Sequence, residues 1–175
     1  LTNFDMYVGV SSGAMIAAGL VNGYDTSDMG LVFIHNSSEE HPVRPGLFLR
    51  PALREYLKRV RAIPGLAADI LKQYMRDPGK DWAEAIDPIG RLLPTGLCDN
   101  RPFERFLANM FTGPGRTNDF RELRRSLYIV ATELNSGYSV RFGEPGFDHV
   151  PISRAIQAST ALPGLYPPVE IDGHT

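Results

Sequence analysis

The chain has 175 residues, 43% of them hydrophobic and 22% charged, and this composition excludes a disordered, collagen-like or repetitive protein. Eighteen Lys and Arg residues against twenty Asp and Glu give a formal net charge of −2, which argues against the strong positive field that a nucleic-acid partner requires. No apolar run reaches the roughly 20 residues of a transmembrane segment, so we expect one globular domain that is soluble or peripheral to a membrane.

The first predicted element is a buried strand from Phe4 to Val10, a run rich in β-branched and aromatic residues. The next segment, Ala14 to Val21, is strongly helix-forming and apolar nearly all round, and Asn22-Gly23 provides its stop. From Pro42 to Asp119 the character changes to helical segments separated by Pro and Gly. We therefore expect a helical insertion over about residues 42–119.

Within this insertion, apolar positions at helical spacing predict helices at about residues 53–60 and 63–75. A third helix is predicted to start near Asn100 or Arg101, with Pro102 in its first turn. Its apolar face consists of Phe103, Phe106, Leu107, Met110 and Phe111. Three basic residues beside the first apolar stripe form either a solvated face or a contact for anionic lipid headgroups, and these are Arg54, Lys58 and Arg61.

The last third of the chain is predicted to contain strands at Leu127–Thr132 and Tyr138–Phe142. A short helix is expected at Ser153–Ser159, capped by Ser153, and Asp172-Gly173 is a turn. Strand, helix, helical insertion, strands and helix in this order predict an α/β architecture.

One motif in the chain indicates chemistry. Gly9-Val10-Ser11-Ser12-Gly13 fits the pattern G-x-S-x-G, at the junction of a predicted strand and a predicted helix. Such a turn exposes the central serine, so Ser11 is a candidate nucleophile, and the backbone N–H of Ser12 is a candidate oxyanion donor at the helix N-terminus. The flanking residues Gly9 and Gly13 let neighbouring elements approach. The alternative is that Ser11 and Ser12 only cap the helix.

A serine nucleophile needs a base. In the chain order Ser, acid, His, only His149 and His174 come late enough to serve a histidine triad. His149 lies in a turn-like segment, where a solvated loop histidine is the simpler interpretation. No metal or organic cofactor is implied, and the single Cys98 excludes a zinc site made of cysteines.

Four segments in this order resemble the patatin-like phospholipase family, and together they extend over nearly the whole chain. They are Phe4–Ala14, Leu93–Asn100, Leu127–Thr132 and Ile156–Val169. The resemblance implies a three-layer α/β/α sandwich. It also implies hydrolysis of lipid or carboxylic esters through an acyl-enzyme by a Ser-Asp dyad, with Ser11 as the nucleophile.

The resemblance leaves the acid open. In the family this aspartate stands in Asp-Gly-Gly or Asp-Gly-Ala, whereas the only Asp-Gly pair here, Asp172-Gly173, precedes His174. Either Asp172 is the base, or it forms a hairpin turn and the base lies beyond Thr175. The family's glycine-rich oxyanion loop does not fit within Leu1 to Val8. We therefore expect residues 1–175 to form one patatin-like acyl hydrolase domain that is truncated at both ends and inactive by itself.

The sequence thus predicts a lipid acyl hydrolase with a lipid or ester substrate, peripheral contact with a membrane surface and no nucleic-acid partner. Two alternatives stay open. One is a histidine-dependent serine esterase or acyltransferase. The other is a catalytically silent lipid-binding module that keeps the fold.

Overall fold

A computed structural model describes residues 4–33, 51 and 96–175 of the chain. The helices expected at 53–60 and 63–75, and the basic residues Arg54, Lys58 and Arg61, lie outside the described residues. Among the helices that are described, none is long and apolar enough to cross a bilayer.

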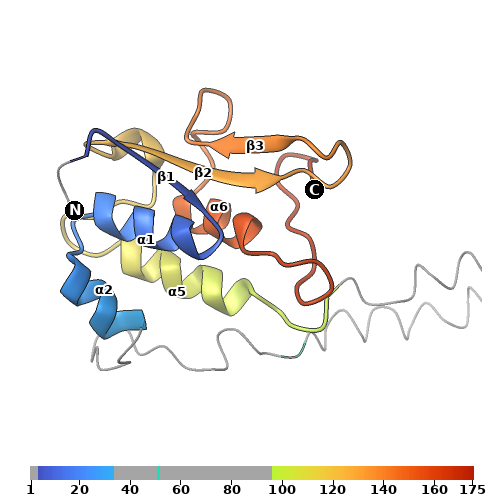
Figure 1. The fold of residues 1–175 in the computed structure, drawn as a ribbon, viewed down its shortest axis with the longest axis horizontal. Helices are drawn as coiled ribbons and strands as arrows, with labels where there is room; N and C mark the ends of the chain where they lie inside the picture. The colour runs from blue at the N-terminus through green and yellow to red at the C-terminus, as the bar shows by residue number, and fades with distance from the viewer. Residues whose placement is uncertain (1–3, 34–50, 52–95) are drawn as a thin grey trace, which may run out of the picture.

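The described part of the chain contains a three-stranded sheet in the order β1-β2-β3 (Figure 1). Strand β1 (Met6–Val10) pairs in parallel with β2 (Ser126–Thr132), which pairs antiparallel with β3 (Ser139–Phe142). Val10 is opposite Val130 at the carboxyl end of the parallel pair. The mixed α/β architecture expected from the element order is confirmed, and β1 delivers the chain to Ser11 at this end of the sheet.

The larger helices lie on one face of the sheet (Figure 1). They are α1 (Ser12–Val21), α5 (Arg101–Phe111) and α6 (Ile152–Ser159); α2 (Thr26–Phe33) follows α1, and a 3₁₀ turn, η2 (Phe120–Glu122), precedes β2. Helix α1 contacts β1, while α6 contacts β2 and α5. Although α5 falls within the range expected for the insertion, it packs in this helical layer.

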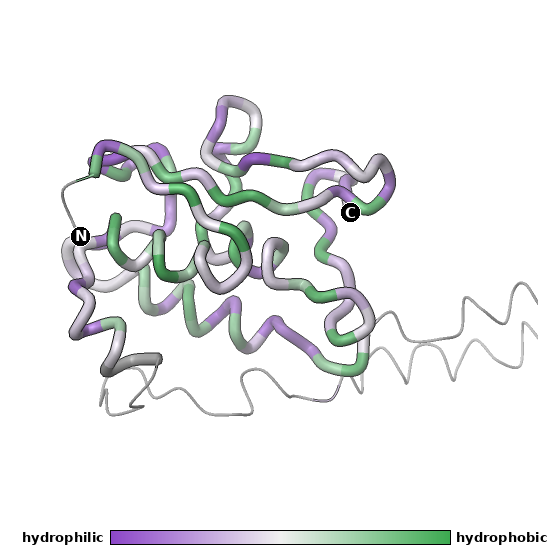
Figure 2. Tube along the Cα trace, in the orientation of Figure 1, coloured by the Kyte–Doolittle hydropathy of each residue, from purple (hydrophilic) through white to green (hydrophobic). Residues whose placement is uncertain are grey.

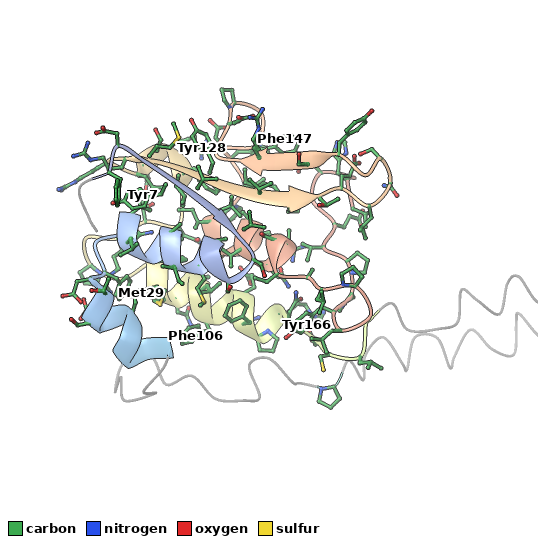
Figure 3. The ribbon with its side chains drawn as sticks, viewed as in Figure 1. Tyr7, Met29, Phe106, Tyr128, Phe147 and Tyr166 are labelled. Atoms are coloured by element: carbon green, nitrogen blue, oxygen red, sulfur yellow. The ribbon has the colours of Figure 1, made fainter. Side chains whose placement is uncertain are left out.

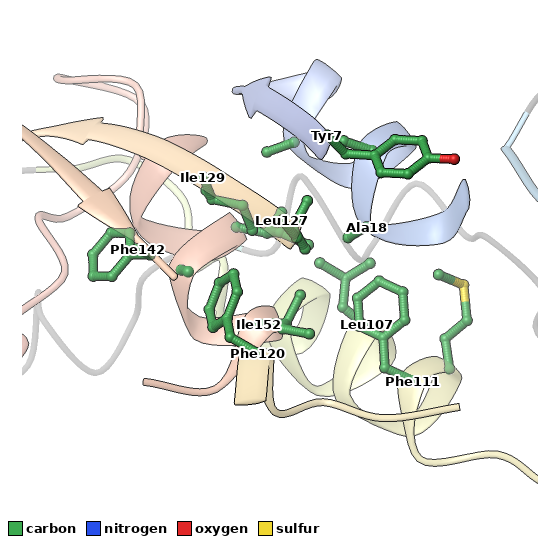
Figure 4. Close-up of a cluster of buried hydrophobic side chains, with 14 of the residues drawn as sticks. Tyr7, Ala18, Leu107, Phe111, Phe120, Leu127, Ile129, Phe142 and Ile152 are labelled. Atoms are coloured by element: carbon green, nitrogen blue, oxygen red, sulfur yellow. The ribbon is translucent and has the colours of Figure 1, made fainter. Parts of the chain in front are cut away.

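The sequence of each helix explains its place in the layer. Helix α1 buries only small residues, Ala14, Ala17, Ala18 and Gly19, and so can approach the strands closely. Helix α5 is amphipathic, and hydrophobic and hydrophilic stretches alternate along it (Figure 2). Four of the five residues predicted for its apolar face are buried: Phe103, Leu107, Met110 and Phe111. Figure 4 shows these helices meeting the inner face of the sheet around Leu107, Leu127 and Ile129.

The opposite face of β1 is uncovered by the described elements. Tyr7 is buried, but Met6, Val8 and Val10 are 56%, 60% and 59% exposed. The predicted buried strand is therefore buried on one face only in the described part of the molecule, because the helices that it describes cover one side of the sheet. An apolar sheet face of this kind needs another layer.

The interface between α5 and α6 is partly polar, which the sequence pattern does not indicate. The side-chain amide of Gln157 donates to Asn100 Oδ1 at 2.7 Å, and both residues are buried. The hydroxyl of Ser153 donates to Glu104 Oε1 at 2.8 Å. The prediction that Ser153 caps α6 is wrong: the helix begins at Ile152 after Pro151, and the Ser153 hydroxyl points to α5 instead.

Candidate active site

Ser11 occupies the turn between β1 and α1, and we call residues 9–13 the Ser11 turn. Its backbone angles are φ 52° and ψ −126°, a region that residues other than glycine rarely adopt and that typically costs about 1–3 kcal/mol. The carbonyl of Ser11 accepts a hydrogen bond from Ala14 N–H at 3.0 Å, so α1 begins immediately after the turn. The chain thus passes from strand to helix in a single strained residue.

The side chain of Ser11 is exposed, and among the described residues its hydroxyl has no hydrogen-bond partner. Ser12 is already the first residue of α1. The alternative in which these two serines serve to cap the helix therefore gains no support, since no side-chain cap bond forms at this end of α1. Within the described residues, the Ser11 hydroxyl is therefore exposed and unpaired on a strained backbone.

The two glycines of the turn have different surroundings. A Cβ atom added to Gly9 would lie 2.4 Å from Ala14 Cα and 2.7 Å from Gly13 O, so only glycine fits where β1 and α1 cross. A Cβ atom at Gly13 would meet nothing within 4 Å. In the described part of the chain, close packing therefore requires Gly9 but not Gly13.

The N-terminus of α1 presents backbone N–H groups that have no acceptor within the helix. No described residue accepts a hydrogen bond from the N–H of Ser12, and the aligned peptide dipoles of the ten-residue helix favour negative charge at this end. This N–H is the oxyanion donor that the sequence predicts, and it belongs to the residue that follows Ser11.

A residue that the sequence analysis did not single out contacts the turn. The backbone N–H of Ser11 donates to Ser159 Oγ at 2.8 Å, and that hydroxyl donates to the carbonyl of Val130 at 2.6 Å. Ser159 ends α6 and is separated from Ser11 by 148 positions in the chain. The only sequence signal was its place in the Ile156–Val169 segment that resembles the family.

Asp172 and Gly173 form the turn of a short hairpin. Their φ angles are 52° and 81°, and the flanking residues Ile171 and His174 exchange two backbone hydrogen bonds of 2.8 Å. Positive φ at both central residues is typical of a two-residue hairpin turn, for which Asp-Gly is a favoured pair. The turn predicted at this position is confirmed.

The carboxylate of Asp172 contacts His149, with 2.8 Å between Oδ2 and Nε2. His174 lies 3.0 Å from Glu133 Oε1, and hydrogen bonds from Ser136 and His174 hold the pKa of Glu133 below its usual value. Among the described residues, no hydrogen bond joins Ser11 to either histidine or to Asp172. The two histidines pair with carboxylates at the hairpin, and the structure does not bring them together with Ser11.

An apolar cavity of about 70 Å³ lies between the sheet and the C-terminal segment. The ends of β2 and β3, α6 and the hairpin line it, through residues that include Ala131, Val140, Phe142, Ala158 and Ile171. Ser11 and Ser12 are not in its lining. The cavity is therefore next to the β2 strand end rather than at the nucleophile candidate.

Two of the segments that resemble the family contact each other near the start of α5. They are Leu93–Asn100 and Ile156–Val169, in the parts that the structure describes. The N–H of Cys98 donates to the carbonyl of Leu165 at 2.8 Å, and Figure 3 shows Tyr166 beside the start of α5. A Cβ atom on Gly96 would lie 2.2 Å from Pro167 N, so glycine is required for this approach. Burial in this junction raises the pKa of Tyr166.

The chain thus combines an α/β fold with an exposed serine between a parallel strand and a helix. The family model that matches is that of the patatin-like phospholipases, and it covers residues 1–175. The chain belongs to the patatin-like phospholipase family, and this membership implies lipid acyl hydrolase activity on lipid substrates. A search of curated proteins gave no match.

Proposed function

We propose that the protein hydrolyses lipid or carboxylic esters with Ser11 as its nucleophile and that the Ser11 turn is a nucleophile elbow. The observation on which this proposal rests is the strained backbone of Ser11, whose exposed hydroxyl stands between a parallel strand and the N-terminus of a helix. Strain of this kind persists only where the surrounding structure enforces it and is concentrated at functional sites. Family membership supports the same chemistry.

The proposed reaction has two steps. An aspartate takes the proton of Ser11 Oγ as the oxygen attacks the ester carbonyl, and the N–H of Ser12 donates to the developing oxyanion. The leaving alcohol takes that proton, and an acyl-enzyme on Ser11 remains. A water molecule, deprotonated by the same aspartate, then attacks the acyl carbon. The bond to Ser11 Oγ breaks, the aspartate returns its proton to that oxygen, and the fatty acid is released. This dyad requires no histidine.

Asp172 is a poor candidate for the base of this dyad. Its carboxylate contacts His149, and its backbone is committed to the hairpin turn. We propose that Asp172 shapes the hairpin and that the base is a different aspartate, in the Asp-Gly-Gly or Asp-Gly-Ala segment that the family resemblance implies.

The three-layer sandwich of the family is also a proposal for this chain. Its support is the uncovered apolar face of β1, where Met6, Val8 and Val10 are more than half exposed. Side chains of this type are rarely left bare as a contiguous group. A second helical layer on that face would complete the α/β/α order.

The experiment that tests the proposal is ester hydrolysis by the full-length protein. We expect Ser11→Ala to lower kcat on a chromogenic fatty-acyl ester about 10³-fold or more, because the nucleophile is removed. Ser139→Ala is the matched control, since Ser139 is an exposed serine of β3, and it should leave the rate unchanged. Hydrolysis that survives Ser11→Ala would contradict the proposal.

Because His149 contacts the carboxylate of Asp172, the alternative of a histidine-dependent esterase is tested as well. Under the Ser-Asp proposal, replacing His149 and His174 by Ala leaves hydrolysis largely intact, whereas a histidine triad would lose it. A catalytically silent lipid-binding module would instead bind liposomes in a sedimentation assay without turning over any ester.

A further inference from the structure

Ser159 is the one residue far along the chain whose side chain bonds directly to the Ser11 turn within the described residues. Its hydroxyl is half-buried and makes two short hydrogen bonds: it accepts from the backbone N–H of Ser11 at 2.8 Å and donates to the carbonyl of Val130 at 2.6 Å. A hydroxyl has one proton, which Ser159 donates in the hydrogen bond to the Val130 carbonyl, so the N–H of Ser11 must be the donor of the other bond. The hydroxyl therefore bridges the Ser11 turn and β2.

The position of this bridge is explained by the sheet register. Val10 and Val130 form the last pair of the parallel ladder, and at the next residue the chain leaves the strand for α1. The ladder cannot continue past that point, which would leave the N–H of Ser11 without a partner. The Ser159 hydroxyl extends the ladder by one step and satisfies this donor.

We propose that Ser159 is a positioning residue for the nucleophile, an inference that rests on the proposed function of Ser11. The bond from the N–H of Ser11 holds that residue at φ 52°, where relaxation toward an ordinary backbone angle would move Oγ. It also occupies the N–H of Ser11, so that the donors left at this turn for the oxyanion are the N–H groups at the start of α1, beginning with that of Ser12. Ser159 acts through the backbone of Ser11 and does not touch substrate.

A purely structural role for Ser159 makes a different prediction. If its hydroxyl only ties α6 to the sheet, its loss lowers stability and leaves the reactivity of the folded protein unchanged. The next residue, Thr160, provides a matched control. Its hydroxyl donates to Ile156 O at 2.8 Å within α6 and, among the described residues, makes no hydrogen bond to the Ser11 turn.

The test compares Ser159→Ala, Ser159→Thr and Thr160→Val in the full-length protein, well below each variant's Tm. We measure the second-order rate of labelling by a fluorophosphonate probe, together with kcat and KM on a chromogenic fatty-acyl ester. We expect Ser159→Ala to slow labelling and lower kcat about 10- to 100-fold with KM little changed, since small displacements of a reacting group carry penalties of this size. Ser159→Thr, which keeps the hydroxyl, should restore both rates to within about 3-fold, and Thr160→Val should stay within about 2-fold.

Equal rates in Ser159→Ala and the parent protein would overturn the inference, as would equal losses in Ser159→Ala and Thr160→Val. Should Ser159→Ala not fold, Ser159→Cys replaces it: a thiol of similar volume is a weak donor and acceptor, and parental rates in that variant would overturn the inference. Failure of the parent protein to label at Ser11 would overturn the proposed function itself. The site of labelling thus tests the role of Ser11, and the rate in Ser159→Ala tests the role of Ser159.

Discussion

Ser11 and Asp172 share a φ of 52°, yet they use it differently. Asp172 precedes Gly173 in a hairpin, and local turn chemistry explains its conformation. No such preference exists for Ser11, which is held by tertiary contacts, among them the hydrogen bond to Ser159. The sequence could therefore predict the Asp-Gly turn and the exposed serine, which depend on neighbouring residues. It could not predict Ser159, because that contact depends on how α6 meets β2.

At this scale the role of Asp172 can be tested with Asp172→Asn in the full-length protein. Asparagine also accepts positive φ, so the hairpin is retained, and the weakened contact with half-exposed His149 is worth less than about 1 kcal/mol. We expect kcat/KM for ester hydrolysis to stay within about 3-fold of the parent protein. A loss of about 10³-fold, as expected for a general base, would identify Asp172 as the acid of the dyad.

Among the elements, those with strong local patterns were predictable. Helix α5 starts at Arg101 as expected and buries most of its predicted face, because amphipathic spacing and an N-terminal proline are local signals. Helix α2 (Thr26–Phe33) was not predicted. It packs through Met29, whose Sδ would lie 2.4 Å from a Cβ atom on Gly19, and this fit between two helices is not visible in a linear sequence.

The close crossing of β1 and α1 can be tested by substitution of its glycines. We expect Gly9→Ala to destabilise the fold by about 2 kcal/mol or more, because the added methyl group would overlap Ala14 Cα. Gly13→Ala should be neutral or stabilising by up to about 1 kcal/mol, since the site is open and Ala favours helices. Chemical denaturation of both variants measures the difference. Equal stabilities would show that the crossing is looser than the structure indicates.

For the whole molecule, the α/β class was predictable from the order of strands and helices, but the layering was not. The apolar run of β1 predicts a buried strand. The described helices cover only the Tyr7 side, where Ala14 and Ala18 pack, and leave Val8 60% exposed. Which helices cover a sheet face depends on long-range packing, and β1 by itself does not contain that information.

The proposed third layer can be tested with Val8→Asp in the full-length protein. If a helical layer covers this face, burial of an unpaired carboxylate should lower the free energy of unfolding by about 2 kcal/mol or more. Ser139→Asp, at an exposed position of β3, is the control and should change it by less than about 0.5 kcal/mol. A neutral Val8→Asp variant would mean that the face remains in contact with solvent.

The central claim is that Ser11 is the nucleophile, and the most direct measurement is the site of covalent labelling in the full-length protein. A fluorophosphonate probe is allowed to react, and the modified peptide is identified by mass spectrometry. We predict a single adduct on Ser11 that is absent from the Ser11→Ala variant. An adduct on a different residue, or labelling that persists in Ser11→Ala, would contradict the account.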